Sequence, residues 1–270
     1  MPGAMAPPDN DSDGWDPGQY ERFAAERAQP FFDLLALVRP VPGGDVVDLG
    51  CGTGELTSVL HHRVEAARTL GIDSSPAMLE RTAAVATPEL RFEAGDIGRF
   101  DAEHAFDLVF ANASLQWVPD HEALLTRLHH ALRPGGQLAV QVPANADHAS
   151  HTVAAEVAAE TPFRQAMHDA PPPDVVRGVL RPEEYAELLD RHGFVEQHVR
   201  LQVYGHHLSS TDDVVEWTKG TALVRFRRLL PPEMFEEFVD AYRRRLRQVL
   251  GAHSPYFYAF KRILFWGRTA

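Results

Sequence analysis

A glycine-rich turn, GCGTG at residues 50–54, joins a predicted strand to a predicted helix. The strand covers residues 45–49, a β-branched run that suits a buried parallel strand, and the helix begins at Glu55. Glycines at alternate positions allow a sharp turn and let a ligand approach the backbone closely. The amides at the start of the helix would lie beside that ligand. This order of elements predicts an α/β fold with a ligand site at the turn.

Short apolar runs and helical patterns continue to alternate along the chain. This alternation predicts a parallel sheet with right-handed crossovers. Two longer strands near the C-terminus, at 194–204 and 256–266, are expected to form an antiparallel edge. The remaining expected elements are helices at 20–38, 76–86, 121–132 and 182–192 and strands at 69–72, 90–94, 106–111 and 137–142.

Two segments do not fit the alternating pattern. The segment at about 145–180 contains a helix and a triple-proline loop, and the segment at 211–250 is largely helical. We interpret both as cap insertions over the carboxyl edge of the sheet, where ligands bind in this architecture. Residues 1–14, rich in Pro, Asp, Gly and Ala, predict a disordered tail. The chain is therefore expected to form a single domain over residues 15–270.

Composition excludes several classes of protein. The formal net charge is −12, which disfavours nonspecific nucleic-acid binding, because that binding depends on clustered cations. One cysteine, Cys51, cannot form an internal disulfide, and no Cys/His cluster has the spacing of a zinc site. No apolar run is long enough to span a membrane. We expect a cytoplasmic protein with a small-molecule partner and without nucleic acid, membrane or metal.

Acidic residues follow the next two predicted strands. Asp73 lies at the end of the second strand, where a carboxylate can accept hydrogen bonds from a ribose diol. Asp96 is expected to end the third strand, followed by Ile97. This pair suits an adenine, since the carboxylate accepts from the amino group and the aliphatic side chain packs on the ring. The pattern predicts a nucleoside site.

The glycine spacing distinguishes between two nucleoside cofactors. Dinucleotide sites carry G-x-G-x-x-G, whereas this chain has G-x-G-x-G preceded by Asp48, with Glu55 after the last glycine. Glu55 would lie unfavourably close to a pyrophosphate. S-adenosylmethionine (SAM) has no phosphate, so the sequence favours SAM. We interpret Cys51, inside the turn, as a small side chain that fits there and not as a nucleophile.

Longer motifs resemble a known family. The DLGCGTG motif at 48–54, together with Asp73, marks class I methyltransferases. Within that class the chain resembles the trans-aconitate 2-methyltransferases from residue 15 onward. The segments that carry this resemblance are WDP at 15–17, FAAER at 23–27, GIDSSPAM at 71–78, FANASLQW at 110–117, LAVQVP at 138–143, EW at 216–217, GTAL at 220–223 and FKR at 260–262.

The resemblance implies a seven-stranded sheet in the order 3-2-1-4-5-7-6, SAM as the methyl donor and one carboxylate of trans-aconitate as the acceptor. It also implies cofactor contacts. Gly50 and Gly52 would approach the methionine part, and Asp73 would hold the ribose. Tyr20 and Arg27 would close the site, with Arg27 a candidate for the SAM carboxylate. The other residues implied on the cofactor side are Asp48, Ser74, Met78, Asp96, Ile97 and Asn112.

Methyl transfer to a carboxylate places few demands on side-chain chemistry. An ionised carboxylate, with a pKa of about 4, is already a nucleophile at neutral pH. We therefore assign no catalytic residue and expect no essential histidine among the 14 present. Alignment of the reactants and removal of water remain as the tasks of the site.

A tricarboxylate acceptor needs cations to hold it. Arg225, Lys261 and Arg262 are the candidates, with coverage of the surface as the alternative. Tyr258 is a candidate hydroxyl donor, although core packing or surface exposure is the stronger expectation for it. Gln116 and Trp117 follow the fourth strand. Gln116 is expected to line the site. For Trp117 we favour packing beneath the next helix over a place in the acceptor wall.

Other functions remain open at this point. One is methylation of another small acid or a natural product. A second is an NAD-dependent oxidoreductase, against which the missing third glycine and Glu55 argue. A third is a SAM-binding protein without catalytic activity. The D/N-P-P-Y signature of many enzymes that methylate amino groups is absent at Asn112, which argues against such acceptors.

Overall fold

The computed structural model describes residues 24–270 of the 270-residue chain, with side chains described from residue 28 onward. The predicted tail at 1–14, Tyr20 and the side chain of Arg27 lie outside the described residues. Within them, no helix has the length and apolar character needed to cross a bilayer.

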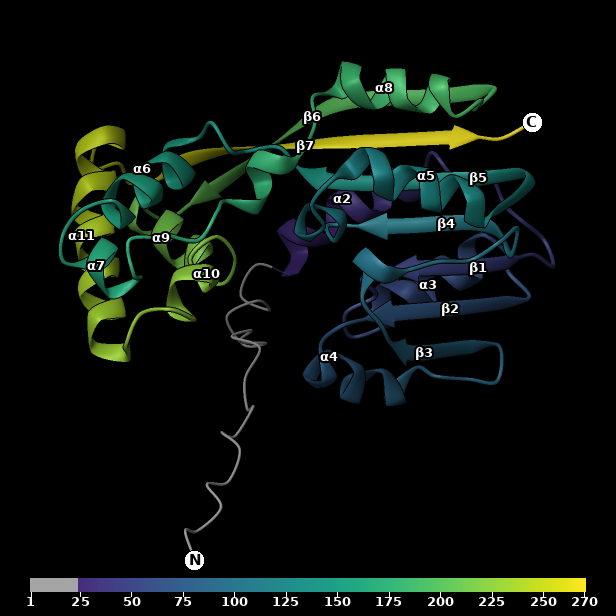
Figure 1. Ribbon diagram of the computed structural model, residues 1–270, viewed down its shortest axis with the longest axis horizontal. Helices are drawn as coiled ribbons and strands as arrows, with labels where there is room; N and C mark the ends of the chain where they lie inside the picture. The colour runs from purple at the N-terminus through teal and green to yellow at the C-terminus, as the bar shows by residue number, and fades with distance from the viewer. Residues whose placement is uncertain (1–23) are drawn as a thin grey trace, which may run out of the picture.

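Seven strands form one sheet in the order β3-β2-β1-β4-β5-β7-β6, which confirms the expected topology (Figure 1). The first five strands in this order run parallel to one another, and β7 runs antiparallel to both β5 and β6. The predicted antiparallel edge is thereby confirmed. The strands are β1 (Asp45–Leu49), β2 (Arg68–Asp73), β3 (Leu90–Ala94), β4 (Phe106–Asn112), β5 (Leu132–Pro143), β6 (Glu196–Leu208) and β7 (Tyr256–Arg268).

Helices cover both faces of this sheet because successive side chains of each strand point to opposite faces. On one face, Val46 and Phe110 share a buried cluster with α2 (Ala24–Leu35) and α3 (Glu55–Arg63). On the other face, Val47 and Val109 pack with α5 (His121–Ala131) and α8 (Pro182–Arg191). The result is a three-layer α/β/α body.

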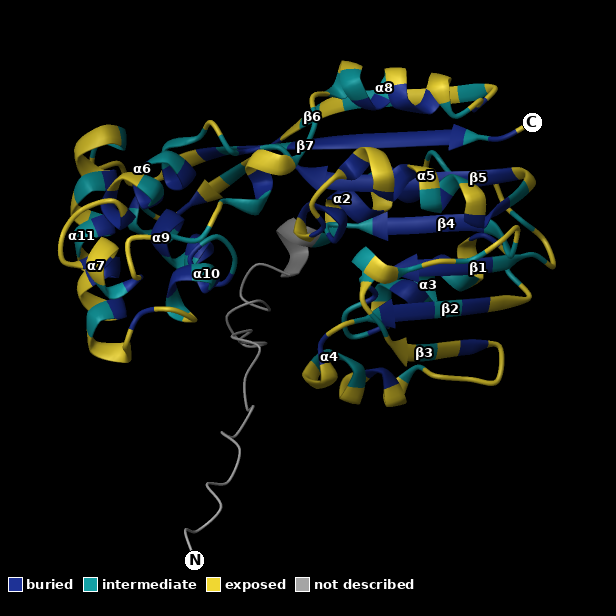
Figure 2. Ribbon diagram, in the orientation of Figure 1, coloured by how far each residue is buried: buried dark blue, intermediate teal, exposed yellow. Residues whose placement is uncertain are grey.

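Five helices form a second lobe, which we call the cap. In Figure 1 the cap lies beyond the end of the sheet to which the parallel strands point. It has its own buried core, and Figure 2 colours parts of its helices as buried. The adjoining ends of β6 and β7 contribute Leu208, Tyr258 and Phe260 to this core. The long strand β7 therefore belongs to both cores. The cap helices are α6 (Ala149–Ala158), α7 (Phe163–Ala166), α9 (Asp212–Lys219), α10 (Val224–Arg227) and α11 (Pro232–Leu250).

Several predicted boundaries differ from the observed ones. α4 spans Pro76–Arg81 and gives way to a 3-10 turn at Thr82–Ala84, so the helix ends earlier than expected. β5 begins at Leu132 because an irregular pairing with β4 carries the strand across the Pro-Gly-Gly segment. β3 ends at Ala94, and Asp96 instead caps a short 3-10 turn at Ile97–Arg99. The third strand therefore ends before Asp96, and the prediction that Asp96 ends it was wrong.

Candidate cofactor and acceptor site

The turn after β1 is shaped by its glycines. Gly50 and Gly52 have φ values of +84° and +57°, in the left-handed region that favours glycine. A Cβ on Gly50 would lie 2.3 Å from the Cβ of Ser114, so close packing also requires glycine there. A Cβ on Gly52 would meet no described atom within 4 Å. The backbone at Gly52 is therefore open to a ligand.

Asp73 connects this turn to the end of β2. Its Oδ2 accepts a hydrogen bond from the amide of Gly52 at 2.9 Å, and its Oδ1 accepts from the amide of Ser75 at 2.9 Å. An ionised carboxylate has lone pairs for further donors. Asp73 therefore holds the turn and keeps accepting capacity at the carboxyl edge of the sheet.

Asp48 lies beneath the turn and not in the cavity wall. Its carboxylate is buried and accepts a hydrogen bond from Thr57 Oγ1 at 2.6 Å. Burial raises the pKa of Asp48 to about 7. The structure thus places Asp48 as a link between β1 and α3, a different position from the predicted cofactor contact. Burial also raises the pKa of the neighbouring Cys51 thiol, which agrees with a packing role.

A cavity of about 360 Å³ lies between the carboxyl edge of the sheet and the cap. One end of its wall, which we call the donor end, consists of the turn after β1 and the helices that follow β1 and β2. The other end, which we call the acceptor end, consists of the cap, β7, and η4 (Val175–Gly178) with the loop before it. Donor-end residues are Thr53, Glu55, Leu56, Met78 and Arg81, and acceptor-end residues include His151, Asp174, Trp217, Arg225, Phe260 and Arg262.

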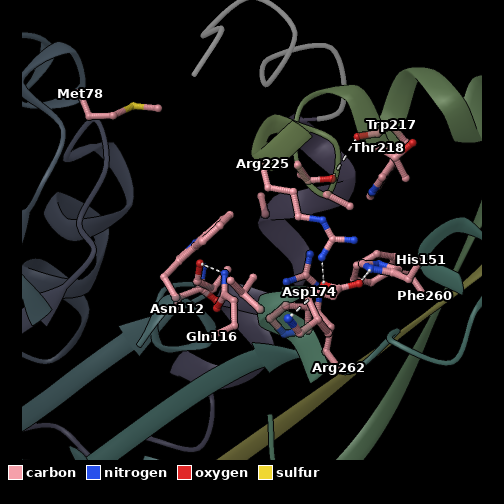
Figure 3. Close-up of a pocket in the computed structure, with 18 of the residues that line it drawn as sticks. Met78, Asn112, Gln116, His151, Asp174, Trp217, Thr218, Arg225, Phe260 and Arg262 are labelled. Atoms are coloured by element: carbon pink, nitrogen blue, oxygen red, sulfur yellow. Dashed lines mark hydrogen bonds and ion pairs between the residues drawn. The ribbon is translucent and has the colours of Figure 1, made fainter. Parts of the chain in front are cut away.

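Two amide side chains lie where β4 ends, at the cavity wall. Asn112 Oδ1 and Gln116 Oε1 are buried and have no hydrogen-bond partner among the described residues. Gln116 Nε2 donates to the carbonyl of Ala113 at 2.7 Å, which fixes its amide (Figure 3). A buried acceptor without a donor is costly, so both oxygens suit a ligand that donates.

The residue set at this edge fits SAM. Met78 and Asn112 line the cavity, and Ile97 lies near Gly50, where a Cβ would be 3.6 Å from its Cδ1. Ser74 and Asp96 are exposed at the same edge. Glu55 lines the donor end, where a pyrophosphate would meet its charge. This arrangement disfavours a dinucleotide.

A buried ionic cluster lies at the acceptor end. Asp174 is 2.9 Å from His151 Nδ1 and 3.2 Å from Arg225 Nη1 (Figure 3). Burial by itself would raise the pKa of Asp174, but the hydrogen bond from His151 and the nearby Arg225 guanidinium lower it overall. Burial lowers the pKa of Arg225. The cluster therefore joins α6, the loop before η4 and α10.

Arg262 reaches the same end of the cavity from β7. Its Nη1 donates to Gln141 Oε1 at 3.0 Å, and its guanidinium lies 4.9 Å from the ring centre of Phe260. Arg225 lies similarly 4.6 Å from the ring centre of Phe226. Aromatic faces favour a stacked guanidinium. Two arginines from separate elements are thus oriented at one end of the cavity.

Other predicted acceptor residues have different positions. Lys261 is not in the described cavity wall, because neighbouring residues of a strand face opposite sides. Its Nζ pairs with Asp147 Oδ1 at 2.6 Å, so its prediction as an acceptor residue is not supported. Trp117 lines the cavity and is 43% exposed, so the favoured packing beneath α5 was wrong. Tyr258 lines the cavity, with its hydroxyl 3.2 Å from Ser150 Oγ.

Among the described residues, one cluster consists of side chains of the types that can bind a metal ion. Glu103, His104 and His130 are all exposed, and each has a ligand atom within 4.8 Å of the others. They lie before β4 begins and near the end of α5, at the edge of the sheet opposite the cavity. This cluster is therefore separate from the candidate site.

Sequence reasoning did not find His151 and Asp174. His151 is on a cap helix and Asp174 follows three prolines in a loop, and neither belongs to a motif or a periodic pattern. The residue types alone do not predict this pair, because the contact between His151 and Asp174 depends on the packing of α6 against the loop.

Comparison with known proteins agrees with this arrangement. The family described as "Methyltransferase domain" matches residues 46–136. A trans-aconitate 2-methyltransferase of Deinococcus radiodurans is 46% identical over 259 residues, covering 93% of this chain and 96% of that protein. Another from Variovorax paradoxus is 39% identical over 236 residues, covering 87% of this chain and 89% of that protein.

Solved structures share the fold at low sequence identity. YcgJ of Bacillus subtilis has a TM-score of 0.58 at 12% identity, covering 89% of this chain and 98% of that chain. Phosphoethanolamine N-methyltransferase 2 of Haemonchus contortus, solved with S-adenosylhomocysteine, has a TM-score of 0.53 at 16% identity, covering 89% of this chain and 52% of that chain. Together with the sheet order, these similarities identify a class I methyltransferase fold. The sequence identity to the relatives extends over nearly the whole chain, so this chain belongs to the trans-aconitate 2-methyltransferase family of SAM-dependent methyltransferases.

Proposed function

We propose that this enzyme transfers a methyl group from SAM to one carboxylate of trans-aconitate, a small tricarboxylic acid, and forms a methyl ester. The observation that carries this proposal is the pair of oriented arginines, Arg225 and Arg262, at the acceptor end. The net charge of the chain is −12, so two guanidinium groups at the acceptor end are a local exception. Such groups bind carboxylates through parallel hydrogen bonds.

The donor end would hold SAM. Gly52 offers open backbone, Asp73 offers accepting capacity for the ribose, and Met78 offers an apolar surface for the adenine. Asn112 lies between the two ends, with a buried oxygen that suits a donor group. When bound, SAM supplies an electrophilic methyl group on a sulfonium centre.

The protein's part in the reaction is to orient and desolvate the acceptor. Arg225 and Arg262 would hold carboxylates that do not react, which leaves another carboxylate free to face the donor end. Trp217 and Phe260 line the same end, where their apolar rings would exclude water. Removal of water makes an anionic nucleophile more reactive. A carboxylate needs no proton removed at neutral pH, so the site requires no general base.

A panel of acids assayed with methyl-labelled SAM tests the proposal. We expect labelled ester from trans-aconitate, with lower kcat/KM for acids that have fewer carboxylates. Transfer to a phenol, an alcohol or an amine, with none to polycarboxylic acids, would refute it. Thermal shifts with S-adenosylhomocysteine and NAD, run in parallel, check the donor side: we expect stabilisation by the former alone.

A further inference from the structure

One side chain of the acceptor end has no part in the function proposed above. His151 is buried on α6 and lines the cavity. Its Nδ1 lies 2.9 Å from Asp174 Oδ2, and because a carboxylate accepts, the ring proton is on Nδ1. Nε2 has no hydrogen bond to any described residue. It is therefore the ring nitrogen that remains for a ligand.

The charges at the acceptor end do not yet match a tricarboxylate. One carboxylate reacts, so two others need counter-charges. Arg225 and Arg262 supply two positive charges, but Asp174 is ionised between Arg225 and His151 and offsets one of them. A protonated His151 restores the balance. With Asp174 at Nδ1 and a substrate carboxylate at Nε2, both N–H groups of a protonated imidazole would donate to anions.

We propose that His151 binds a second, non-reacting carboxylate of the acceptor through Nε2 and thereby makes the enzyme selective for polycarboxylic acids over monocarboxylic acids. Asp174 is the positioning residue that holds the ring. This inference rests on the proposed function, because it assumes an acceptor with several carboxylates.

Other ionisable groups around His151 do not replace it. His148, at the start of the same helix, has a pKa lowered to about 4 by burial, so it is neutral at pH 7. Burial raises the pKa of Tyr258, on β7, to about 12, so it is also neutral. The charged groups that face the cluster are Asp174 from the loop, Arg177 from η4, Arg225 from α10 and Arg262 from β7.

The test compares His151→Leu with His168→Gln, a matched control on an exposed histidine of the cap. We would measure the KM for trans-aconitate and the inhibition constants of tricarballylate and butyrate, which have three carboxylates and one. A hydrogen bond between charged groups predicts that His151→Leu raises the KM and the tricarballylate constant about ten- to a hundredfold. The butyrate constant and the affinity for S-adenosylhomocysteine should stay unchanged, and the control should match wild type.

The outcomes separate this inference from the proposed function. A wild-type enzyme that methylates no polycarboxylic acid defeats the proposed function. A wild-type enzyme that methylates trans-aconitate, with an unchanged KM in His151→Leu, defeats only the role of His151. His151→Gln covers the case in which the leucine variant does not fold. His151→Gln keeps a hydrogen-bond donor but no positive charge, so the KM for trans-aconitate should also rise in that variant, and a wild-type KM there would overturn the inference.

Discussion

Replacement of Asp174 by Asn tests how much the buried ionic cluster, which joins α6, α10 and the loop before η4, stabilises the fold. The side chain of Asp174 is 4% exposed, and those of His151 and Arg225 are 7% and 10% exposed. The variant would leave Arg225 buried without its counter-charge. Removing one partner of a buried ion pair costs about 3–5 kcal/mol of unfolding free energy. At about 2–4 °C for each kcal/mol in a domain of this size, the melting temperature should fall by about 6–20 °C.

Urea denaturation at pH 7 measures this loss, with Asp169→Asn as the control. Asp169 pairs with Arg164 on the surface, where the side chains are 69% and 50% exposed, and such a pair contributes about 0–1 kcal/mol. The folded pKa of Asp174 is lowered, so its stabilisation is present at neutral pH and is lost as pH falls through the acid range. Asp174→Asn should lack that acid-dependent loss. A variant as stable as the control would refute this reasoning. Asp174→Asn and Arg225→Met should not lose stability additively when combined, because the two residues are partners, so additive losses of unfolding free energy in the double variant would also refute it.

Four further predictions follow from the site. Asp73→Ala should weaken SAM binding, measured by calorimetry, because the carboxylate both holds Gly52 and is expected to accept from the ribose; wild-type affinity would contradict this. Gly50→Ala should destabilise the fold by about 1–3 kcal/mol in urea, because its Cβ would overlap Ser114, and an unaltered midpoint would show that this contact is not tight. The folded pKa of Asp48 is about 7, above its unfolded value of about 3.9, so wild-type stability should fall as pH rises from 4 to 7 and then level off. Asp48→Asn should abolish that fall, and an unchanged pH dependence would count against a raised pKa. Arg262→Met should raise the acceptor KM with SAM affinity unchanged, and loss of both together would indicate general damage to the site.

The fold could be predicted largely from local patterns. The turn at 50–54 follows a β-branched strand and opens a helix, and these are properties of neighbouring residues. The alternation of strands and helices gave the parallel part of the sheet. The insertion of β7 between β5 and β6 is a long-range pairing that the pattern does not contain, and it came from the family resemblance.

The candidate site could be predicted less completely. Adjacent residues of a strand face opposite sides of the sheet. Once β7 is recognised as a strand, the sequence therefore already predicts that Lys261 and Arg262 point to opposite sides. Asp48 has the residue type of a ligand contact, but its burial beneath the turn depends on the position of Thr57. The pairing of His151 with Asp174 depends on how α6 packs against a proline-rich loop, which no sequence period encodes.

A crystal structure of the enzyme with S-adenosylhomocysteine and trans-aconitate measures the acceptor's position directly. We predict that the nucleoside lies beside Gly52 and Asp73, with carboxylates of the acid within hydrogen-bond distance of Arg225, Arg262 and His151 Nε2. A well-ordered acid bound elsewhere, or bound in the cavity with both arginines turned away from it, would contradict this mode of binding.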